Sequence, residues 1–434
     1  MNDNNMNYNE SVDWANVEVP KKESFFKRHA FAFGFLSSFV GVILAIVLVK
    51  GYLGLTGNLL VIGENGASQV EPGRILDDEV IEKIDTIYSY MNVYYYEDFD
   101  KDAIREGIYS GVLESLGDPY SVYYTPQDYE DLMVNTTGTY CGIGAGVSRN
   151  LTTMEVTITK VYKGTPAEEA GLKDGDMIIS VEDVEAVTVS VDELVQHIRG
   201  EEGTDVHIVI YRPSTEETLE FDVTRRFVEL ASVEGEMLDN GIGYIEITEF
   251  QAKTDEQFIE MVNEFKAQGM KGLIVDVRAN PGGLLSSVTS LLDHVLPEGL
   301  LVYVEDKYGN REDYNSDPLC LDIPMVVLID QNSASASEIF AGALKDYEYA
   351  KLERKTTYGK GIVQNIFPLE EGDAIKLTTA KYFTPNGNYI HGVGIEPDIE
   401  VEYEYTGDPE APYDKQYDSQ FVKALEEMER LLVE

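Results

Sequence analysis

The pattern of apolar and polar positions divides this chain into three kinds of region. From about residue 77 to 116, apolar residues recur at helical spacing, which predicts two helices. Between residues 138 and 228 the pattern instead shows short alternating strands, such as 156–161, around one helix near 191–199. From residue 230 to 402, continuous apolar runs alternate with helical patterns, which is typical of strand–helix units.

Two strand–loop–helix units stand out in this last region. An apolar strand at 272–278 runs through Asn280-Pro281-Gly282-Gly283 into a helix, and a second strand at 325–330 runs into a helix at 337–346. Buried strands followed by helices predict a parallel sheet with helices on its faces. Both loops should then open at the carboxyl ends of their strands, where such sheets keep their sites.

Ser335 lies on the turn between the second strand and its helix. Backbone N–H groups at a helix start are unpaired and lie at the positive end of the helix dipole, which suits an oxyanion. Ser333, Ser335 and Ser337 alternate, so spacing alone does not select a nucleophile. Ser337 is the natural N-cap candidate, and Ser333 is expected to be a turn residue.

Lys360 follows 25 residues after Ser335, between two glycines and before an apolar pair. A serine hydroxyl is a weak nucleophile until a base takes its proton. Lysine is such a base only if burial lowers its pKa from about 10.4 toward neutrality. An isolated lysine is more commonly a solvated surface charge.

The stretches 333–346 and 359–364, at this separation, resemble the carboxyl-terminal processing peptidases, also called tail-specific proteases. The resemblance covers nearly all of the chain after residue 75. It implies a serine endopeptidase with a Ser-Lys dyad, in which Ser335 is the nucleophile and Lys360 the base.

The resemblance also implies the surroundings of the dyad. Gln364 corresponds to a position whose amide orients the lysine. The oxyanion hole would combine the backbone N–H of Ala336 with one from the Gly282–Gly283 loop, for which we take Gly282. The implied core is an α/β protease core of the ClpP/crotonase type, without a cofactor. No metal is expected, because the sequence has no Cys-x-x-Cys and no His-Glu-x-x-His.

Residues 164–178 resemble the core of a PDZ domain. In that module the C-terminal carboxylate of a peptide binds backbone N–H groups of a glycine-rich loop, and the peptide adds a strand. The corresponding loop residues here are Gly142, Ile143, Gly144 and Ala145. Alone, this Gly-Ile-Gly would indicate only a β-turn. Residues 181–185 lack the Asn-Gly or Asp-Gly turn of many PDZ domains, so the geometry of that turn is open.

Residues 30–49 are uncharged and mostly apolar, and as a helix they would rise about 30 Å, enough to span a bilayer. Four basic residues precede this stretch and favour a cytoplasmic N-terminus: Lys21, Lys22, Lys27 and Arg28. We therefore expect a single-pass anchor in the cell membrane, with the rest of the chain outside the cytoplasm. A cleavable signal peptide is the alternative, although no clear small-x-small site follows.

The expected architecture is α+β and multidomain. Its segments are a cytoplasmic tail (1–29), a transmembrane anchor (30–50), a linker (51–75), an N-terminal helical region (76–137), a PDZ domain (138–228), a Ser-Lys protease core (229–402) and a C-terminal helical tail (403–434).

The net charge of −46 lies entirely after residue 50, because the acidic and basic residues among residues 1–50 cancel. Such a charge repels nucleic acid and anionic lipid headgroups, so it argues against a nucleic-acid partner. The expected partners are protein substrates bound by their C-termini. The physiological substrate, gating by the PDZ domain and a possible homodimer stay open.

Two other functions compete with the protease. A PDZ adaptor could keep an inert protease-like core, although the intact serine, lysine and Pro-Gly-Gly loop argue against it. A trypsin-like PDZ protease would need a catalytic histidine, for which His391 is the candidate. His391 follows an Asn-Gly-Asn turn, however, and the chain has no Gly-x-Ser-x-Gly elbow.

Overall fold

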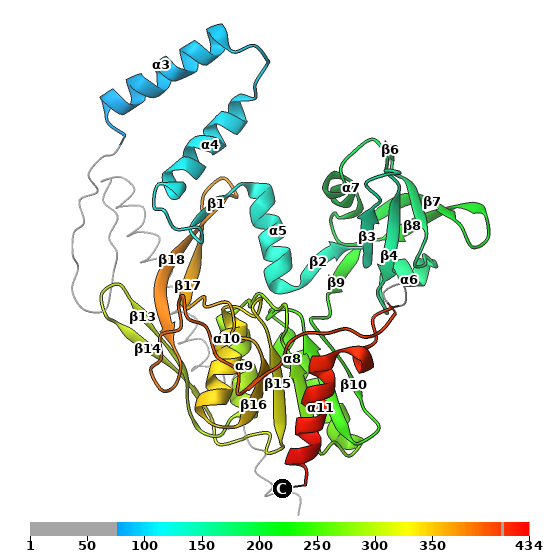
Figure 1. Ribbon diagram of the computed structural model, residues 1–434. Coiled ribbons are helices and arrows are strands. Elements are labelled where there is room, and N and C mark those ends of the chain that lie inside the picture. The colour runs from blue at the N-terminus through cyan, green and yellow to red at the C-terminus, as the bar shows by residue number, and fades with distance from the viewer. Residues whose placement is uncertain (1–75, 409–411, 434) are drawn as a thin grey trace, which may run out of the picture. The chain divides into compact units, whose positions relative to one another are not determined.

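The computed structural model describes residues 76–408 and 412–433 (Figure 1). The predicted cytoplasmic tail, anchor and linker lie outside these residues. Across the two described ranges, no helix combines the length and the apolar character needed to cross a membrane. The chain forms two compact units, residues 1–99 and 100–434, and each is considered by itself.

The predicted N-terminal helices are both present. In the first unit, α3 (Asp78–Tyr94) begins where the Asp77 side chain accepts a hydrogen bond from the Val80 N–H at 2.9 Å. In the second unit, α4 (Lys101–Glu114) is followed by Gly117 at φ +67°. Neither helix buries a side chain in the described structure. A third helix, α5 (Pro126–Thr137), was not predicted.

The PDZ-like region is a strand module closed by two short helices. Its elements are β3 (Ala145–Arg149), β4 (Val156–Val161), α6 (Pro166–Ala170), β5 (Met177–Val181), β6 (Val184–Glu185), α7 (Val191–Ile198), β7 (Asp205–Arg212) and β8 (Glu217–Thr224). Alternate residues of β7 point inward, where Ile208 and Ile210 pack with Leu194 of α7. The predicted strands and helix are therefore confirmed. Strand β2 (Thr139–Gly142) pairs antiparallel with β9 (Arg226–Glu229), which brings the two ends of the module together.

The turn that the sequence left open is a tight one between β5 and β6. Val181 pairs with Val184, so Glu182 and Asp183 form the loop. Glu182 has φ +49°, a conformation that normally favours glycine or asparagine. Its strain is offset by contacts with His207, because the Glu182 N–H donates to the His207 carbonyl and the Glu182 carboxylate accepts from the His207 N–H.

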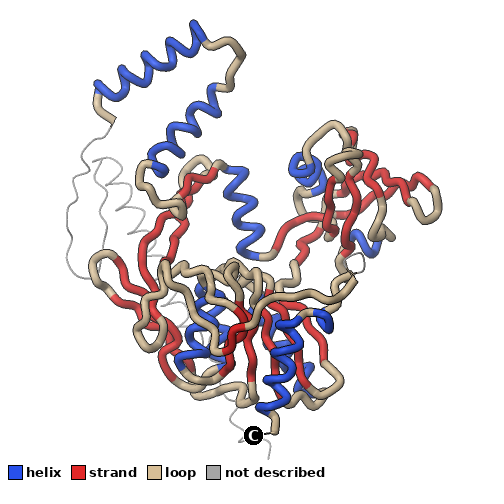
Figure 2. The backbone as a smooth tube through the Cα atoms, viewed as in Figure 1, coloured by secondary structure: helices blue, strands red, loops and turns tan. Residues whose placement is uncertain are grey.

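A mostly parallel sheet forms the centre of the remaining region. Its order is β10 (Val233–Met237), β11 (Ile242–Ile247), β12 (Gly272–Asp276), β15 (Met325–Ile329), β16 (Ala350–Arg354) and β19 (Ile399–Glu400). All neighbours are parallel except β10 and β11. The predicted parallel pairing of the two strand–loop–helix units is confirmed, since β12 and β15 are adjacent. Figure 2 shows these strands with helices beside them.

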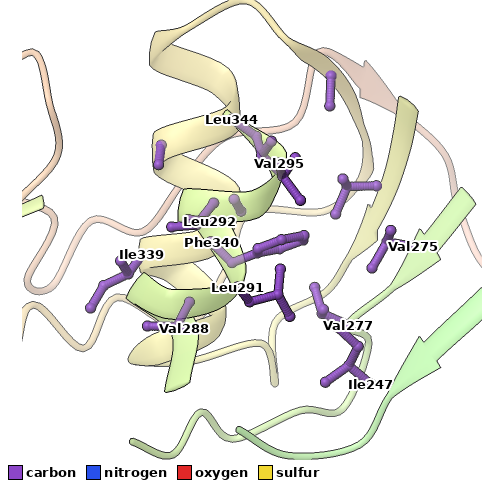
Figure 3. Packing of buried hydrophobic residues seen from close by; sticks show 14 of the residues in the cluster. Ile247, Val275, Val277, Val288, Leu291, Leu292, Val295, Ile339, Phe340 and Leu344 are labelled. Carbon is purple, nitrogen blue, oxygen red and sulfur yellow. The ribbon is translucent and has the colours of Figure 1, made fainter. Parts of the chain in front are cut away.

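Both faces of the sheet are covered, and the side chains divide by alternation along each strand. Three helices pack on one face: α8 (Thr254–Ala267), α9 (Leu285–Val295) and α10 (Ala336–Asp346). Val275 and Val277 of the β12 segment meet Leu291 and Phe340 there (Figure 3). Ile274, which precedes Val275, belongs to the other face, with the C-terminal helix α11 (Ser419–Leu431). Two-sided burial explains why these strands read as continuous apolar runs.

A buried ionic network fixes α11 to the carboxyl end of β12. The Arg278 guanidinium donates to Asp276 and, at 2.6 Å, to Asp418, whose carboxylate also accepts the Gln420 N–H at the start of α11. Burial opposes the ionised form of Asp418, but the Tyr413 hydroxyl and Arg278 hold its pKa below the usual value. The predicted helical tail is therefore part of the core.

A second, antiparallel sheet adjoins the pocket described below. It contains β1 (Val122–Tyr124), β13 (Gly299–Asp306), β14 (Arg311–Ser316), β17 (Ile362–Pro368) and β18 (Ala374–Phe383). Strand β18 is its centre, because β1, β13 and β17 all pair with it. The pairing joins residues 250 positions apart, such as Tyr124 and Ala374.

Glu353 on β16 is a buried carboxyl whose oxygens have no hydrogen-bond partner in the described ranges. Burial, with a contribution from Glu427, raises its pKa to about 7. The folded pKa exceeds the unfolded value of about 4.3, so the contribution of Glu353 to stability is greatest below pH 4.3 and is lost as pH rises through about 7.

We expect Glu353→Gln to remove this decline and stabilise the core at pH 8 by about 2 kcal/mol, with a smaller effect at pH 5. Hydrogen exchange of the β16 amides measures the local free energy of opening at both pH values. Equal stabilisation at pH 5 and pH 8 would show that titration of Glu353 is not the cause.

Candidate active site

A pocket of about 440 Å³ lies where the two strand–loop–helix units meet the second sheet. It is lined by Ser335 and Ala336 from the start of α10, Gly282 from the loop after β12, and Lys360 and Gln364 from the segment that becomes β17. The structure thus gathers all five residues that the sequence assigned to the dyad, its orienting amide and the oxyanion hole. His391 does not line this pocket and is exposed.

Ser335 sits on a strained turn. Its φ and ψ are 54° and −114°, a conformation that residues with a Cβ seldom adopt. It is also the N-cap of α10, so the expectation that Ser337 caps this helix is wrong. The Ser337 hydroxyl instead donates to the Asn280 carbonyl at 3.0 Å. The Ser333 hydroxyl donates to the Val277 carbonyl, in keeping with its expected place in the turn.

Asn280 joins the two loops around Ser335. Its carbonyl accepts from the Ala334 N–H at 3.1 Å as well as from Ser337. Its side chain donates to the Ile247 carbonyl and accepts from the Gly282 N–H at 2.8 Å. The Gly282 N–H is therefore already engaged by the Asn280 side chain.

The glycine loop approaches the serine turn more closely than a side chain would permit. Gly282 has φ +109°, and a Cβ built there would lie 2.8 Å from the Ser335 Cβ and 2.9 Å from the Ala336 nitrogen. A Cβ on Gly283, at φ +139°, would lie 2.2 Å from the Phe250 carbonyl oxygen. Gly282 is thus required where the loop approaches the serine turn, and Gly283 where the loop passes the Phe250 backbone.

Lys360 is half-buried, and burial lowers the pKa of its ammonium. The positive charge of Lys376 lowers it further, while the carboxylates of Glu338 and Asp118 act in the opposite direction. Lys360 Nζ lies 4.8 Å from the centroid of the Tyr120 ring and is not hydrogen-bonded to the Ser335 hydroxyl. Catalytic hydrogen bonds are commonly longer in the absence of substrate than in the reacting complex.

Gln364 is placed by a β-bulge. The register between β17 and β18 shifts between Val363 and Gln364, and such a shift re-aims side chains. The Gln364 amide faces the pocket and donates to the Thr378 hydroxyl at 3.4 Å. It lies four positions after Lys360, which comes just before the strand begins.

Glu338 is the residue that sequence reasoning missed. It is fully buried on α10, and one carboxylate oxygen accepts from the Ser335 N–H at 2.9 Å and the Lys360 N–H at 2.8 Å. The other accepts from the Gly359 N–H at 2.7 Å and the Thr357 hydroxyl at 2.5 Å. One carboxylate therefore fixes the backbone of both predicted dyad residues. The available signal was the Ser-x-x-Glu spacing from Ser335, the pattern of a capping box.

The predicted carboxylate-binding loop lies on the PDZ-like module and does not line this pocket. Ile143 is buried in the core of the module, while Gly144 has φ +81°. The Gly144 carbonyl accepts from the Tyr162 N–H, and a Cβ on Gly144 would lie 2.3 Å from Thr165. The loop is thus held by its carbonyls.

No group of three or more His, Cys, Asp and Glu side chains within residues 76–408 and 412–433 is arranged to hold a metal ion. The chemistry that this pocket offers is that of a hydroxyl, an amine with a lowered pKa and backbone N–H groups at a helix start.

Comparison with known proteins agrees with this chemistry. Residues 241–401 match peptidase family S41, residues 157–212 match a PDZ domain, and residues 62–127 match the N-terminal domain of the activating protease CtpB. The carboxyl-terminal-processing protease of Synechocystis is 34% identical over 390 residues, covering 86% of this chain and 91% of the relative.

Two further proteins are similar to this chain, one by sequence and one among solved structures. The carboxy-terminal processing protease CtpB of Bacillus subtilis is 36% identical over 330 residues, covering 75% of this chain and 68% of the relative. Among solved structures, the photosystem II D1 C-terminal processing protease is 27% identical, with a TM-score of 0.43, covering 77% of this chain and 89% of that one. The chain therefore belongs to the carboxyl-terminal processing proteases, serine peptidases of family S41 that contain a PDZ domain.

Proposed function

We propose that the protein is an endopeptidase with a Ser-Lys dyad, in which Ser335 is the nucleophile and Lys360 the general base. One observation supports this above all others. A single pocket holds a serine at a strained helix start and a lysine whose burial lowers the pKa of its ammonium. A neutral amine near a hydroxyl is the minimum that a serine peptidase without a catalytic histidine requires.

The proposed reaction has two halves. In the first, the neutral Lys360 amine takes the proton of the Ser335 hydroxyl as the oxygen attacks the scissile carbonyl carbon. The lysine then returns this proton to the leaving amine nitrogen as the C–N bond breaks, which leaves an acyl-enzyme ester. In the second half, a water molecule takes the place of the amine. Lys360 takes a proton from this water as its oxygen attacks the ester carbon, and the proton then passes to the Ser335 oxygen as the ester C–O bond breaks.

Backbone N–H groups would stabilise the oxyanion of each half. Ala336 is the first residue of α10, so its N–H is one of the unpaired donors of the helix start. The Gly283 N–H is the second donor that we propose, since that of Gly282 is bound to Asn280. Gln364 would orient Lys360 through its amide.

The PDZ domain would bind the C-terminal carboxylate of a substrate through the N–H groups of residues Gly142, Ile143, Gly144 and Ala145. Support comes from the backbone of this loop, which is glycine-rich and held by its carbonyls. The substrate would then be presented to the dyad by its tail.

We further propose that the protein is anchored in the cell membrane by residues 30–50, with the catalytic part outside the cytoplasm. The basic residues before this stretch and its apolar length support the proposal. Association into a homodimer would cover apolar residues of α4 that lie exposed in the described unit, such as Val112.

The proposed function is tested with casein and with one peptide in two forms, with a free and with an amidated C-terminus. The full chain should fragment casein and a peptide with an apolar C-terminus, and a fluorophosphonate should label Ser335, as located by peptide mass spectrometry. Amidation of the peptide C-terminus should raise KM several-fold and leave kcat nearly unchanged. Absence of both fragments and label would refute the dyad, whereas identical kinetics for acid and amide would refute carboxylate capture.

A further inference from the structure

Tyr120 lies outside the motifs of the proposed dyad, yet its ring contacts the proposed base. Lys360 Nζ is 4.8 Å from the ring centroid. At this distance the quadrupole of an aromatic ring attracts an ammonium ion and does not attract a neutral amine to the same degree. The ring therefore favours one protonation state of Lys360 over the other.

The loop that carries Tyr120 is a rigid turn. The Asp118 carboxylate accepts from the Tyr120 N–H at 3.0 Å and from the Ser121 hydroxyl at 2.6 Å. Burial opposes ionisation of Asp118, but the hydrogen bonds from Ser121 and Thr378 hold its pKa below the usual value. Such a turn fixes the backbone from which the Tyr120 ring projects.

The same loop is tied to the strand that contacts Gln364. The Thr378 N–H donates to the Ser121 hydroxyl at 3.1 Å, while the Thr378 hydroxyl accepts from the Gln364 amide at 3.4 Å. Strand β1, which follows the loop directly, pairs with β18 from Val122 opposite Lys376. The Tyr120 loop and Gln364 are thus both bound to Thr378, and Tyr120 contacts Lys360 directly.

We infer that Tyr120 is a positioning residue whose ring binds the protonated ε-ammonium of Lys360. This inference rests on the proposed function. In the proposed reaction, Lys360 carries the proton between its removal from Ser335 and its delivery to the leaving amine. The ring gives the charged lysine a fixed place during that interval, without making a bond to substrate.

Charged groups around Lys360 also act on its ammonium, through their full charge, whereas Tyr120 acts through the face of a neutral ring. Lys376 of β18 disfavours the ammonium, whereas Glu338 of α10 and Asp118 favour it through their negative charge. The hydrogen bond with the Tyr358 hydroxyl, together with burial, raises the pKa of Tyr120 to about 12, so the ring remains a neutral phenol below that pH. His391 acts on Asp118, where its charge helps to lower the pKa of the carboxyl.

The test compares Tyr120→Leu, which keeps an apolar cover but removes the aromatic face, with Tyr120→Phe, which keeps the face. In Tyr120→Leu the acid limb of the kcat/KM profile should move to lower pH by about 0.5 unit, and kcat should fall about tenfold. Tyr120→Phe should restore the wild-type position of the limb. Tyr358→Phe, the matched control, removes the hydrogen bond between the Tyr120 and Tyr358 hydroxyls but keeps the Tyr120 ring, so it should not move the acid limb.

A second readout does not depend on activity. In full-length Ser335→Ala protein with ¹³Cε-labelled lysine, the Lys360 signal, assigned by its loss in Lys360→Met, should titrate about 0.5 unit lower after Tyr120→Leu. Tyr120→Met gives the same comparison if the leucine variant does not fold. An unchanged or higher midpoint would overturn the inference, whatever the outcome for the dyad. If Lys360→Met protein retained activity, the proposed dyad would be refuted, but the titration of Lys360 would still show whether the Tyr120 ring stabilises the ammonium.

Discussion

Substitution of Ser335 by alanine or of Lys360 by methionine is expected to lower kcat/KM on casein by at least about 10³-fold. Each change removes one half of a unit that moves a single proton, so the double variant should be no slower than the slower single variant. Lys271→Met, which removes an exposed lysine away from the pocket, serves as the control. Initial rates with purified full-length variants measure the effect, and thermal melting verifies folding.

The dependence of kcat/KM on pH is a second test of Lys360 as the general base. Because burial lowers the pKa of Lys360, the amine is freed below the ordinary lysine value of about 10.4. The base is active when deprotonated, so kcat/KM should rise with pH and reach a plateau once the lysine has lost its proton. A flat single-turnover profile from pH 5 to 10, or full activity of Lys360→Met, would contradict the assignment.

The part of the site that could be predicted consists of residues set by local pattern. Ser335 follows an apolar run, and Gly282 follows another. Because parallel strands end at one edge of a sheet, these two turns had to meet there. The strand–helix alternation therefore gave both the layered core and the place of the pocket. Lys360 and Gln364, the choice of Ser335 among three alternating serines, and the role of Gly282 came only from the resemblance to a known family.

The remainder depends on contacts between distant parts of the chain. Tyr120 reaches Lys360 because β1 pairs with β18, some 250 positions later, and no periodicity in either segment indicates that pairing. Asn280 was assigned no role from the sequence, but its main chain and side chain bind the end of β11, its own loop and the start of α10. The choice of Ser337 as the N-cap failed for the same reason: its hydroxyl donates to the Asn280 carbonyl, 57 positions earlier in the chain.

Glu338→Gln is expected to lower kcat by about 10² to 10³-fold and the free energy of unfolding by about 2 to 4 kcal/mol. Each carboxylate oxygen of Glu338 faces at least one backbone N–H, from Gly359 on one side and from Ser335 and Lys360 on the other. A glutamine amide has only one oxygen, so its NH₂ group must oppose an N–H in either orientation. The Ser335 turn and the Lys360 loop would then lose their common anchor. KM should change little, since Glu338 does not line the pocket.

The pH profile separates this anchoring role from a general loss of packing. The negative charge of Glu338 raises the pKa of Lys360 against the effect of burial, so a neutral glutamine should let that pKa fall further. The plateau of kcat should therefore drop while the acid limb moves to lower pH. Glu348→Gln, an exposed change just beyond α10, should leave both unchanged. A Glu338→Gln protein with reduced stability but an unmoved limb would mean that the carboxylate only supports the fold, and that its charge does not act on the lysine.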